Sequence, residues 1–113
     1  MPNARQRLGA DAERRVRRHY RLRGYRVLAT NVWAGGHELD LVLRRGGRLG
    51  FCEVKARATA GYDAREAVGP EKLRRLRRAA ESWLAARPEL NELDVVLEVA
   101  AVQEGRIQRL PLL

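Results

Sequence analysis

The sequence contains a single cysteine, Cys52, among 113 residues, and few aromatic side chains. One cysteine cannot form an internal disulfide bond, and its place in a strand-like segment is typical of a buried structural thiol rather than a nucleophile. Because only 5% of the residues are aromatic, the core must be built mainly from leucine, valine and alanine. Serine, cysteine and histidine are also not arranged in a pattern that indicates covalent catalysis.

Long hydrophobic runs are missing as well. The first thirty residues contain no apolar stretch of signal-peptide length, and no later run approaches the roughly 20 residues of a membrane-spanning helix. We therefore expect a cytoplasmic protein without a membrane partner. Internal repeats and low-complexity segments are absent, and 113 residues suffice for one modest core. The sequence predicts one domain over residues 1–113, with a flexible start at residues 1–6.

Acidic residues are outnumbered: 14 aspartates and glutamates stand against 23 lysines and arginines, a net charge of +9. Most of the basic residues are arginines, whose planar guanidinium group binds phosphate and carboxylate. This composition predicts a polyanionic partner. Nucleic acid, an anionic membrane surface and an acidic protein all carry such charge, and composition alone does not distinguish them.

The pattern of apolar residues, glycines and prolines predicts seven elements. A four-residue apolar spacing from Leu8 to Tyr20 indicates a helix that ends at Gly24. Pro70 and Pro88 bound a second helix with an apolar face. Predicted strands lie at 25–33, 37–45, 48–56, 93–102 and 106–110. The order helix, three strands, helix, two strands predicts an α/β fold around one mixed five-stranded sheet.

Gly46-Gly47 predicts a two-residue hairpin turn, which fixes how the flanking strands pair. Counting outward from this turn places Leu39, Leu41 and Leu43 on one apolar face of the strands. The other face begins with an apolar pair. Beyond that pair, the count brings four charged residues together, with Asp40 opposite Glu53 and Glu38 opposite Lys55.

Glu38 opposite Lys55 is an ordinary cross-strand ion pair, whereas Asp40 opposite Glu53 destabilises the sheet by repulsion. A bound proton, an arginine or a hard divalent cation could offset this repulsion. Carboxylate oxygens suit Mg²⁺ or Mn²⁺. Lys55 lies on the same face as Glu53, where its amine could hold a nucleophilic water or a scissile phosphate.

Asp40, the hairpin and Glu53-Val54-Lys55 together resemble the signature of the PD-(D/E)XK nuclease superfamily. The whole chain resembles the YraN-like family of predicted endonucleases, which is similar to archaeal Holliday junction resolvases. The resemblance covers nearly the entire sequence. It runs through "GADAERRVRRHYRLRGYRVLATN", "HELDLV", "FCEVKAR", "AVGPEKLRRLRRAAESWL" and "LDVV".

The resemblance implies a restriction-endonuclease-like fold and a site for Mg²⁺ or Mn²⁺. It implies that Asp40, Glu53 and the backbone carbonyl of Val54 bind the metal, that Lys55 is the catalytic lysine, and that Glu13 completes the acidic cluster. Where the family usually has glycine immediately before the Glu-x-Asp stretch, this chain has His37. A homodimer is also implied, because a four-way junction has two-fold symmetry.

The arginines of the two helices are too little offset by acids to be only a solvated surface. We interpret them, with the arginine after the catalytic lysine, as contacts to a phosphate backbone, which give affinity without sequence information. The candidates are Arg14, Arg18, Arg21, Arg57, Arg74 and Arg78. Glu38 and His37 are secondary candidates for the site. Trp33 and Trp83 could stack on bases, but both are expected in the core.

The leading hypothesis is therefore a magnesium-dependent endonuclease that hydrolyses phosphodiester bonds in nucleic acid, with structured or branched DNA expected from the resemblance. The alternative is a catalytically silent nucleic-acid-binding module that keeps the nuclease fold. An adaptor for an acidic protein is a third hypothesis. The sequence does not separate DNA from RNA, and it names neither the preferred structure nor the pathway.

Overall fold

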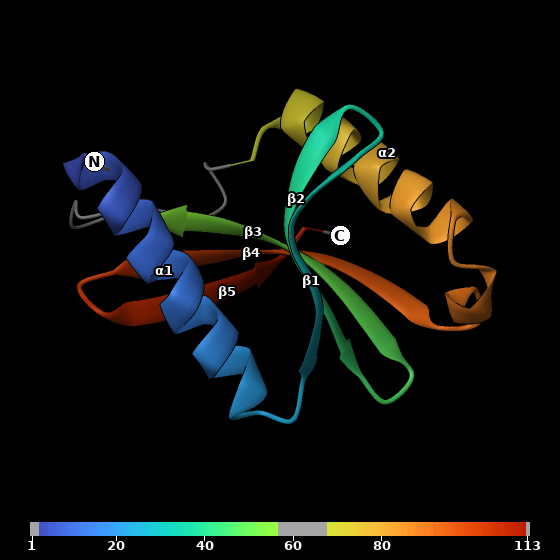
Figure 1. Cartoon of the computed structure of the whole chain (residues 1–113), viewed down its shortest axis with the longest axis horizontal. Coiled ribbons are helices and arrows are strands. Elements are labelled where there is room, and N and C mark those ends of the chain that lie inside the picture. The colour runs from blue at the N-terminus through green and yellow to red at the C-terminus, as the bar shows by residue number, and fades with distance from the viewer. Residues whose placement is uncertain (1–2, 57–67, 113) are drawn as a thin grey trace.

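A computed structural model describes residues 3–56 and 68–112 of the chain. It contains two α-helices, a short 3₁₀ helix and five strands in the predicted order (Figure 1). These elements are α1 (Ala4–Arg21), β1 (Arg26–Ala34), β2 (His37–Arg45), β3 (Arg48–Ala56), α2 (Pro70–Ala85), η2 (Pro88–Leu90), β4 (Asp94–Gln103) and β5 (Arg106–Pro111). The α/β class and the seven predicted elements are confirmed.

The five strands form one mixed sheet in which chain order and spatial order agree, β1-β2-β3-β4-β5. All neighbours run antiparallel except β3 and β4, which are parallel. A parallel neighbour requires a crossover connection, and α2 lies in the chain between these two strands. The helices cover opposite faces of the sheet, each over its own hydrophobic cluster (Figure 1).

Helix α1 presents Ala12, Val16 and Tyr20 to the sheet, as the apolar spacing predicts. Leu8 does not share this contact, since 47% of its surface is exposed. The helix also begins earlier than its apolar stripe indicates. Asn3 and a glutamine three residues later form a reciprocal capping box that satisfies free backbone N–H groups of the first turn, so the helix begins at Ala4.

A polar contact holds the C-terminal part of α1 on the sheet. The Tyr20 hydroxyl donates a hydrogen bond to Oε1 of Glu98 on β4. Arg109 on β5 donates to the same oxygen over 2.9 Å and places its guanidinium group 4.5 Å from the centre of the Tyr20 ring. Because three elements meet in this contact, α1 is fixed in position relative to the sheet, together with the acid Glu13 that it carries.

Strand β2 leaves strand β3 at Asp40. The predicted pairing is confirmed from Arg45–Arg48 to Leu41–Cys52, where the ladder between the two strands ends. Beyond this point β3 continues only with β4, while β2 continues with β1. The predicted pairs Asp40–Glu53 and Glu38–Lys55 are therefore wrong, because a fork separates the two strands at those positions (Figure 1).

The alternation of side chains also changes at this fork. Leu41 and Leu43 pack under α1, but Leu39 packs under α2, so the single apolar face predicted for these three leucines is wrong. In β1, Thr30 pairs with Leu41 and Val32 with Leu39, and Asn31 between them has a positive φ of 50°. Asparagine is among the few residue types that tolerate this conformation, and here it accompanies the change of face.

The turn between β1 and β2 lies directly against α2. Gly35 has a φ of 58°, and a Cβ atom there would stand 2.9 Å from the backbone oxygen of Arg78. Gly36 also has a positive φ, 79°, but a Cβ atom at this position would have no neighbour within 4 Å. Only glycine fits at residue 35 on both counts, and its close approach fixes the turn against the helix.

We predict that Gly35→Ala destabilises the protein more than Gly36→Ala. Both substitutions force alanine into the left-handed region, at about 1 kcal/mol, but only Gly35→Ala also pushes the turn away from α2, for about 1–2 kcal/mol more. Urea unfolding followed by circular dichroism measures both values. Equal losses of stability would show that the contact with Arg78 contributes nothing.

Candidate functional site

Glu53 on β3 is the only charged residue in the buried class within the described ranges, with 7% of its surface exposed. Two lysines face its carboxylate. Nζ of Lys72 lies 2.8 Å from Oε1, and Nζ of Lys55 lies 3.7 Å from the same oxygen. Isolated burial of a carboxylate costs several kcal/mol, so these ammonium groups are what keep a charged Glu53 in the fold.

Asp40 on β2 lies at the point where the fork opens. Its Oδ2 accepts a hydrogen bond of 2.9 Å from the backbone N–H of Val54 on β3, so a side chain connects the strands where their ladder has ended. Burial, and then the charge of Glu53, raises the pKa of Asp40 to about 7, although the hydrogen bond from Val54 acts in the opposite direction. Near neutral pH this carboxyl group is therefore divided between its two protonation states.

The two lysines differ in electrostatic environment. Burial and the neighbouring charge of Lys72 lower the pKa of Lys55. Burial also acts to lower the pKa of Lys72, but the contacts with Glu53 and Lys55 outweigh it and raise that pKa. Lys72 is thus the permanent counter-ion of Glu53, whereas Lys55 is the amine that loses its proton more readily.

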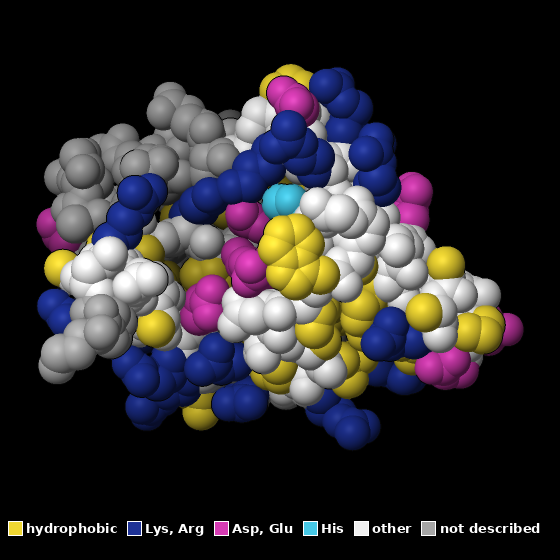
Figure 2. Space-filling view, turned by 45° about the horizontal axis from the view of Figure 1, so that its top comes forward, with side chains coloured by type: hydrophobic (Ala, Val, Ile, Leu, Met, Phe, Trp, Pro, Cys, Tyr) yellow, Lys and Arg dark blue, Asp and Glu magenta, His cyan; other side chains and the backbone are white. Residues whose placement is uncertain are grey.

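Two further acids lie around this centre, since the charges of Glu13 and Glu38 both help to raise the pKa of Asp40. Oε2 of Glu13 on α1 accepts a hydrogen bond of 3.2 Å from Nδ2 of Asn31 on β1, which aims this glutamate at the sheet. Figure 2 shows a row of acidic side chains on this face, with lysine and arginine side chains above and below it.

The oxygen ligands at this site suit a divalent cation whose coordination is completed by substrate and water. The groups that the structure brings together are the carboxylates of Asp40 and Glu53, and the resemblance adds the backbone carbonyl of Val54. Within residues 3–56 and 68–112, no three side chains of His, Cys, Asp or Glu gather closely enough to hold a metal alone. Mg²⁺ is commonly bound through one or two carboxylates, with waters and substrate phosphates filling the other positions, and this arrangement meets that requirement.

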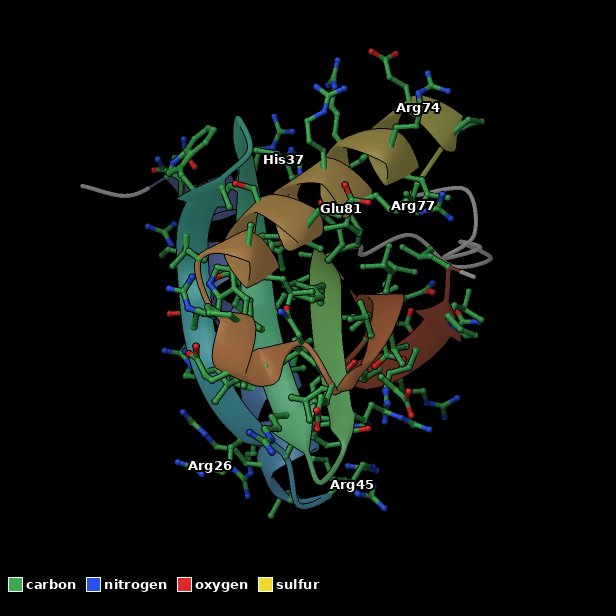
Figure 3. The ribbon with its side chains drawn as sticks, turned by 90° about the vertical axis from the view of Figure 1, so that its right-hand side faces the viewer. Arg26, His37, Arg45, Arg74, Arg77 and Glu81 are labelled. Atoms are coloured by element: carbon green, nitrogen blue, oxygen red, sulfur yellow. The ribbon has the colours of Figure 1, made fainter. Side chains whose placement is uncertain are left out.

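The secondary candidates lie at the edge of the site. Glu38 pairs with Trp33 across β1 and β2. The ion pairs of Lys55 and Lys72 both go to Glu53, which replaces the predicted pairing of Lys55 with Glu38. His37 begins β2 beside α2 (Figure 3). Its Nε2 atom is buried, and among the described residues it has no hydrogen-bond partner.

The arginines predicted to bind phosphate lie on exposed surfaces of both helices. Arg14 and Arg18 line a hollow of about 470 Å³ between α1 and the β4–β5 turn. Arg14 also pairs with Asp11, with 3.2 Å between Nη2 and Oδ1. Arg21, Arg74 and Arg78 are exposed. Arg57 lies outside the described residues, so its predicted role has no structural counterpart here.

The sequence analysis did not single out Lys72. The one local signal was its place in the first turn of α2, two residues after Pro70. Trp33 was predicted in the core, and this is wrong, because 73% of its surface is exposed, whereas Trp83 is buried as expected. Cys52 is also buried, and burial raises its pKa to about 12, in agreement with a structural thiol.

Helices of the described ranges are too short or too polar to cross a lipid bilayer. Both carry charged residues throughout their exposed faces.

We predict that Asp40→Asn stabilises the protein at pH 8 in the absence of divalent cations. The pKa of Asp40 is about 7 in the fold, against 3.8 for a free carboxyl group. Its contribution to stability is therefore complete below about pH 4 and is lost as the pH rises through 7. The substitution should add about 2 kcal/mol at pH 8 and little at pH 4, as measured by urea unfolding.

The control is Asp11→Asn on α1. Hydrogen bonds from Arg15 and Arg14 lower the pKa of Asp11, so this carboxylate contributes stability at neutral pH and loses it as the pH falls. Asp11→Asn should therefore destabilise the protein at pH 8. A gain in both variants, or in neither, would contradict the assignment of the raised pKa to Asp40.

We also predict that Lys72→Met destabilises the protein more than Glu53→Gln combined with Lys72→Met. The single variant leaves Glu53 buried with only the more distant Lys55, at a cost of about 2 kcal/mol, whereas the double variant removes the buried charge as well. Thermal and urea unfolding of the three proteins at pH 8 measure this coupling. Additive effects would show that Lys72 does not compensate Glu53.

Comparison with known proteins identifies a family for this chain. The profile of the family described as "Uncharacterised protein family UPF0102" matches residues 12–102. A UPF0102 protein of Synechococcus sp. is 40% identical over 101 residues, covering 88% of this chain and 77% of that protein. One of Paramagnetospirillum magneticum is 40% identical over 110 residues, covering 94% and 84%. The chain belongs to family UPF0102.

Proposed function

We propose that this protein is a metal-dependent nuclease that hydrolyses phosphodiester bonds in nucleic acid. The observation that carries the proposal is the group formed by Asp40, Glu53, Lys55 and Lys72 at the fork between β2 and β3. Two carboxylates, one of them with a raised pKa, and two lysines meet there on a basic protein. Strongly perturbed ionisable groups that lie together are typical of catalytic sites.

In this proposal Asp40, Glu53 and the carbonyl of Val54 hold Mg²⁺ or Mn²⁺. Such a cation polarises a phosphate oxygen and lowers the pKa of a bound water. Deprotonated Asp40 would serve best as a ligand, and the nearby positive charge would favour that state. The hydrogen bond from the Val54 N–H holds Oδ2 of Asp40 in place, so the carboxylate is oriented before substrate arrives.

Lys55 is the residue suited to handling the water proton. The reaction forms a bond from the water oxygen to phosphorus and breaks the bond from phosphorus to the leaving sugar oxygen. The water proton passes to a base, and the leaving oxygen takes a proton from solvent. Because its pKa is lowered, Lys55 can accept the proton or hold the water by a hydrogen bond.

Lys72 has a different task. It pairs with Glu53 over 2.8 Å, which neutralises the carboxylate in the absence of a cation. With a cation on Glu53, the Lys72 ammonium group would be able to contact the phosphate and stabilise its charge as the new bond forms. One lysine thus stabilises the empty site and the charged transition state in turn.

The exposed arginines of α1 and α2 would position the nucleic acid. Exposed basic residues on α1 and α2 bind the phosphate backbone without reading sequence. Branched or structured DNA is the substrate that the resemblance to junction resolvases suggests. A silent binding module would use these arginines but would have no need of a buried carboxylate with its compensating lysine, and this favours the enzyme.

We expect wild-type protein to cleave at least one of five substrates in 5 mM Mg²⁺ or Mn²⁺: a four-way junction, a splayed fork, a duplex, single-stranded DNA and structured RNA. Glu53→Gln and Lys55→Ala should each lower the cleavage rate by about a hundredfold or more, since each removes a group that acts on the reacting phosphate. Gel assays of cleavage and of binding, performed in parallel, measure both effects.

Glu81→Gln is the matched control, because Glu81 is an exposed acid on α2 (Figure 3). This variant should cleave as wild type does. If the Glu53 and Lys55 variants retain binding but lose cleavage, these two residues act in the cleavage reaction rather than in binding. Binding without cleavage of any substrate, unaffected by metal, would instead establish the silent module.

A further inference from the structure

Trp33 is the exposed aromatic residue within residues 3–56 and 68–112. It leaves 73% of its surface in solvent, while the other aromatic residues that the structure describes are buried, Trp83 at 5% and Tyr25 at 7% exposure among them. A single exposed apolar side chain needs no explanation by itself. The surroundings of Trp33 therefore decide whether it has a function.

Trp33 lies beside Glu38, one of the acids whose charge acts on Asp40. It pairs with Glu38 across β1 and β2, so the two side chains are neighbours on one face of the strands. Val32 and Ala34, on either side of it in sequence, pack into the cluster under α2. The indole ring consequently points away from α2. In Figure 2 a large exposed hydrophobic side chain stands directly beside a histidine and the acidic row.

The segment that carries Trp33 is held firmly. Gly35 places the turn against the backbone of Arg78 on α2, and Ala34 pairs with His37 at the end of the ladder. Nearer the site, the Asn31 side chain donates a hydrogen bond to Glu13. A rigid indole loses little entropy when a ligand stacks on it, which makes it a good binding surface.

The charges around Trp33 select the kind of ligand. An apolar protein surface laid on the indole would strip water from Glu38 and the acids beyond it, which is unfavourable. A nucleobase offers a flat ring to the indole and keeps its polar edges in water. Its phosphates would meet the lysine and arginine side chains that lie above and below the acidic row (Figure 2).

We propose that Trp33 stacks on an unpaired base next to the phosphate that the site cleaves. The inference rests on the proposed nuclease function and specifies its substrate. A base inside a continuous duplex has both faces covered by its neighbours, so it cannot stack on an indole without leaving the helix. The substrate is therefore nucleic acid with an unpaired base at a branch point, a loop or a single-stranded arm.

The test measures binding without cleavage. Wild type, Trp33→Ala and Trp33→Phe are titrated in EDTA with two fluorescent DNAs of equal length, a splayed fork and a blunt duplex. Trp33→Ala should bind the fork about tenfold more weakly, the effect of losing one stacked base, and should bind the duplex as wild type does. Trp33→Phe should recover most of the loss, because a phenyl ring also stacks.

Leu28→Ala is the matched control, since Leu28 is an exposed apolar residue of β1 near its opposite end, where Figure 3 shows Arg26 far from His37. This variant should bind both DNAs as wild type does. Stacking should also quench the fluorescence of Trp33 when the fork is added to wild type. Unfolding curves confirm that each variant is folded, as expected for exposed positions.

Equal loss on the fork and the duplex, or no loss on either, would overturn the role of Trp33. So would a change in sedimentation of Trp33→Ala, which would assign the indole to a contact between two copies of the chain. Binding in EDTA does not depend on chemistry. Selective fork binding without cleavage would therefore refute the nuclease alone, and cleavage with unaltered fork binding in Trp33→Ala would refute only the stacking.

Discussion

The burial of the Glu53 carboxylate is the constraint on which the site depends. A charge at 7% exposure is tolerated only beside opposite charge, and Lys72 supplies that charge from the first turn of α2. The start of α2 therefore has to lie at the position where β3 carries Glu53. Packing of Leu76 and Trp83 orients the rest of the helix, so electrostatics and hydrophobic contacts fix the same element from two ends.

The fork at Asp40 has a comparable double origin. β3 pairs with β4 along its whole length, and β2 follows β1 toward the turn that rests on α2. These two strand pairings separate β2 from β3 beyond Leu41. The hydrogen bond from the Val54 N–H to Asp40 replaces the missing ladder contact. The residue that reconnects the two strands is thus also the one whose carboxyl group belongs to the proposed site.

Local sequence signals were sufficient to predict the helices and strands. They were insufficient to predict on which face of the sheet the side chains of β1 and β2 lie. Gly46-Gly47 and Pro70 mark boundaries by their own backbone preferences, and the structure agrees. The alternation of side chains along β1 places Trp33 in the core only if Asn31 has ordinary extended backbone angles. The positive φ of Asn31 depends on tertiary contacts, which the local sequence does not reveal. Lys72 could not be singled out either, because only its distance to a buried acid distinguishes it from the arginines around it.

The broken pairing of β1 has a consequence for assembly. β1 and β5 are the outer strands of the sheet. β1 is irregular between Val27 and Ala29 and again at Asn31, and β5 is short and ends in a proline. Edges interrupted in this way are poor templates for a strand from another molecule. A two-fold assembly of this protein would accordingly join through its helices or turns, and the sheets of the two copies would not pair edge to edge.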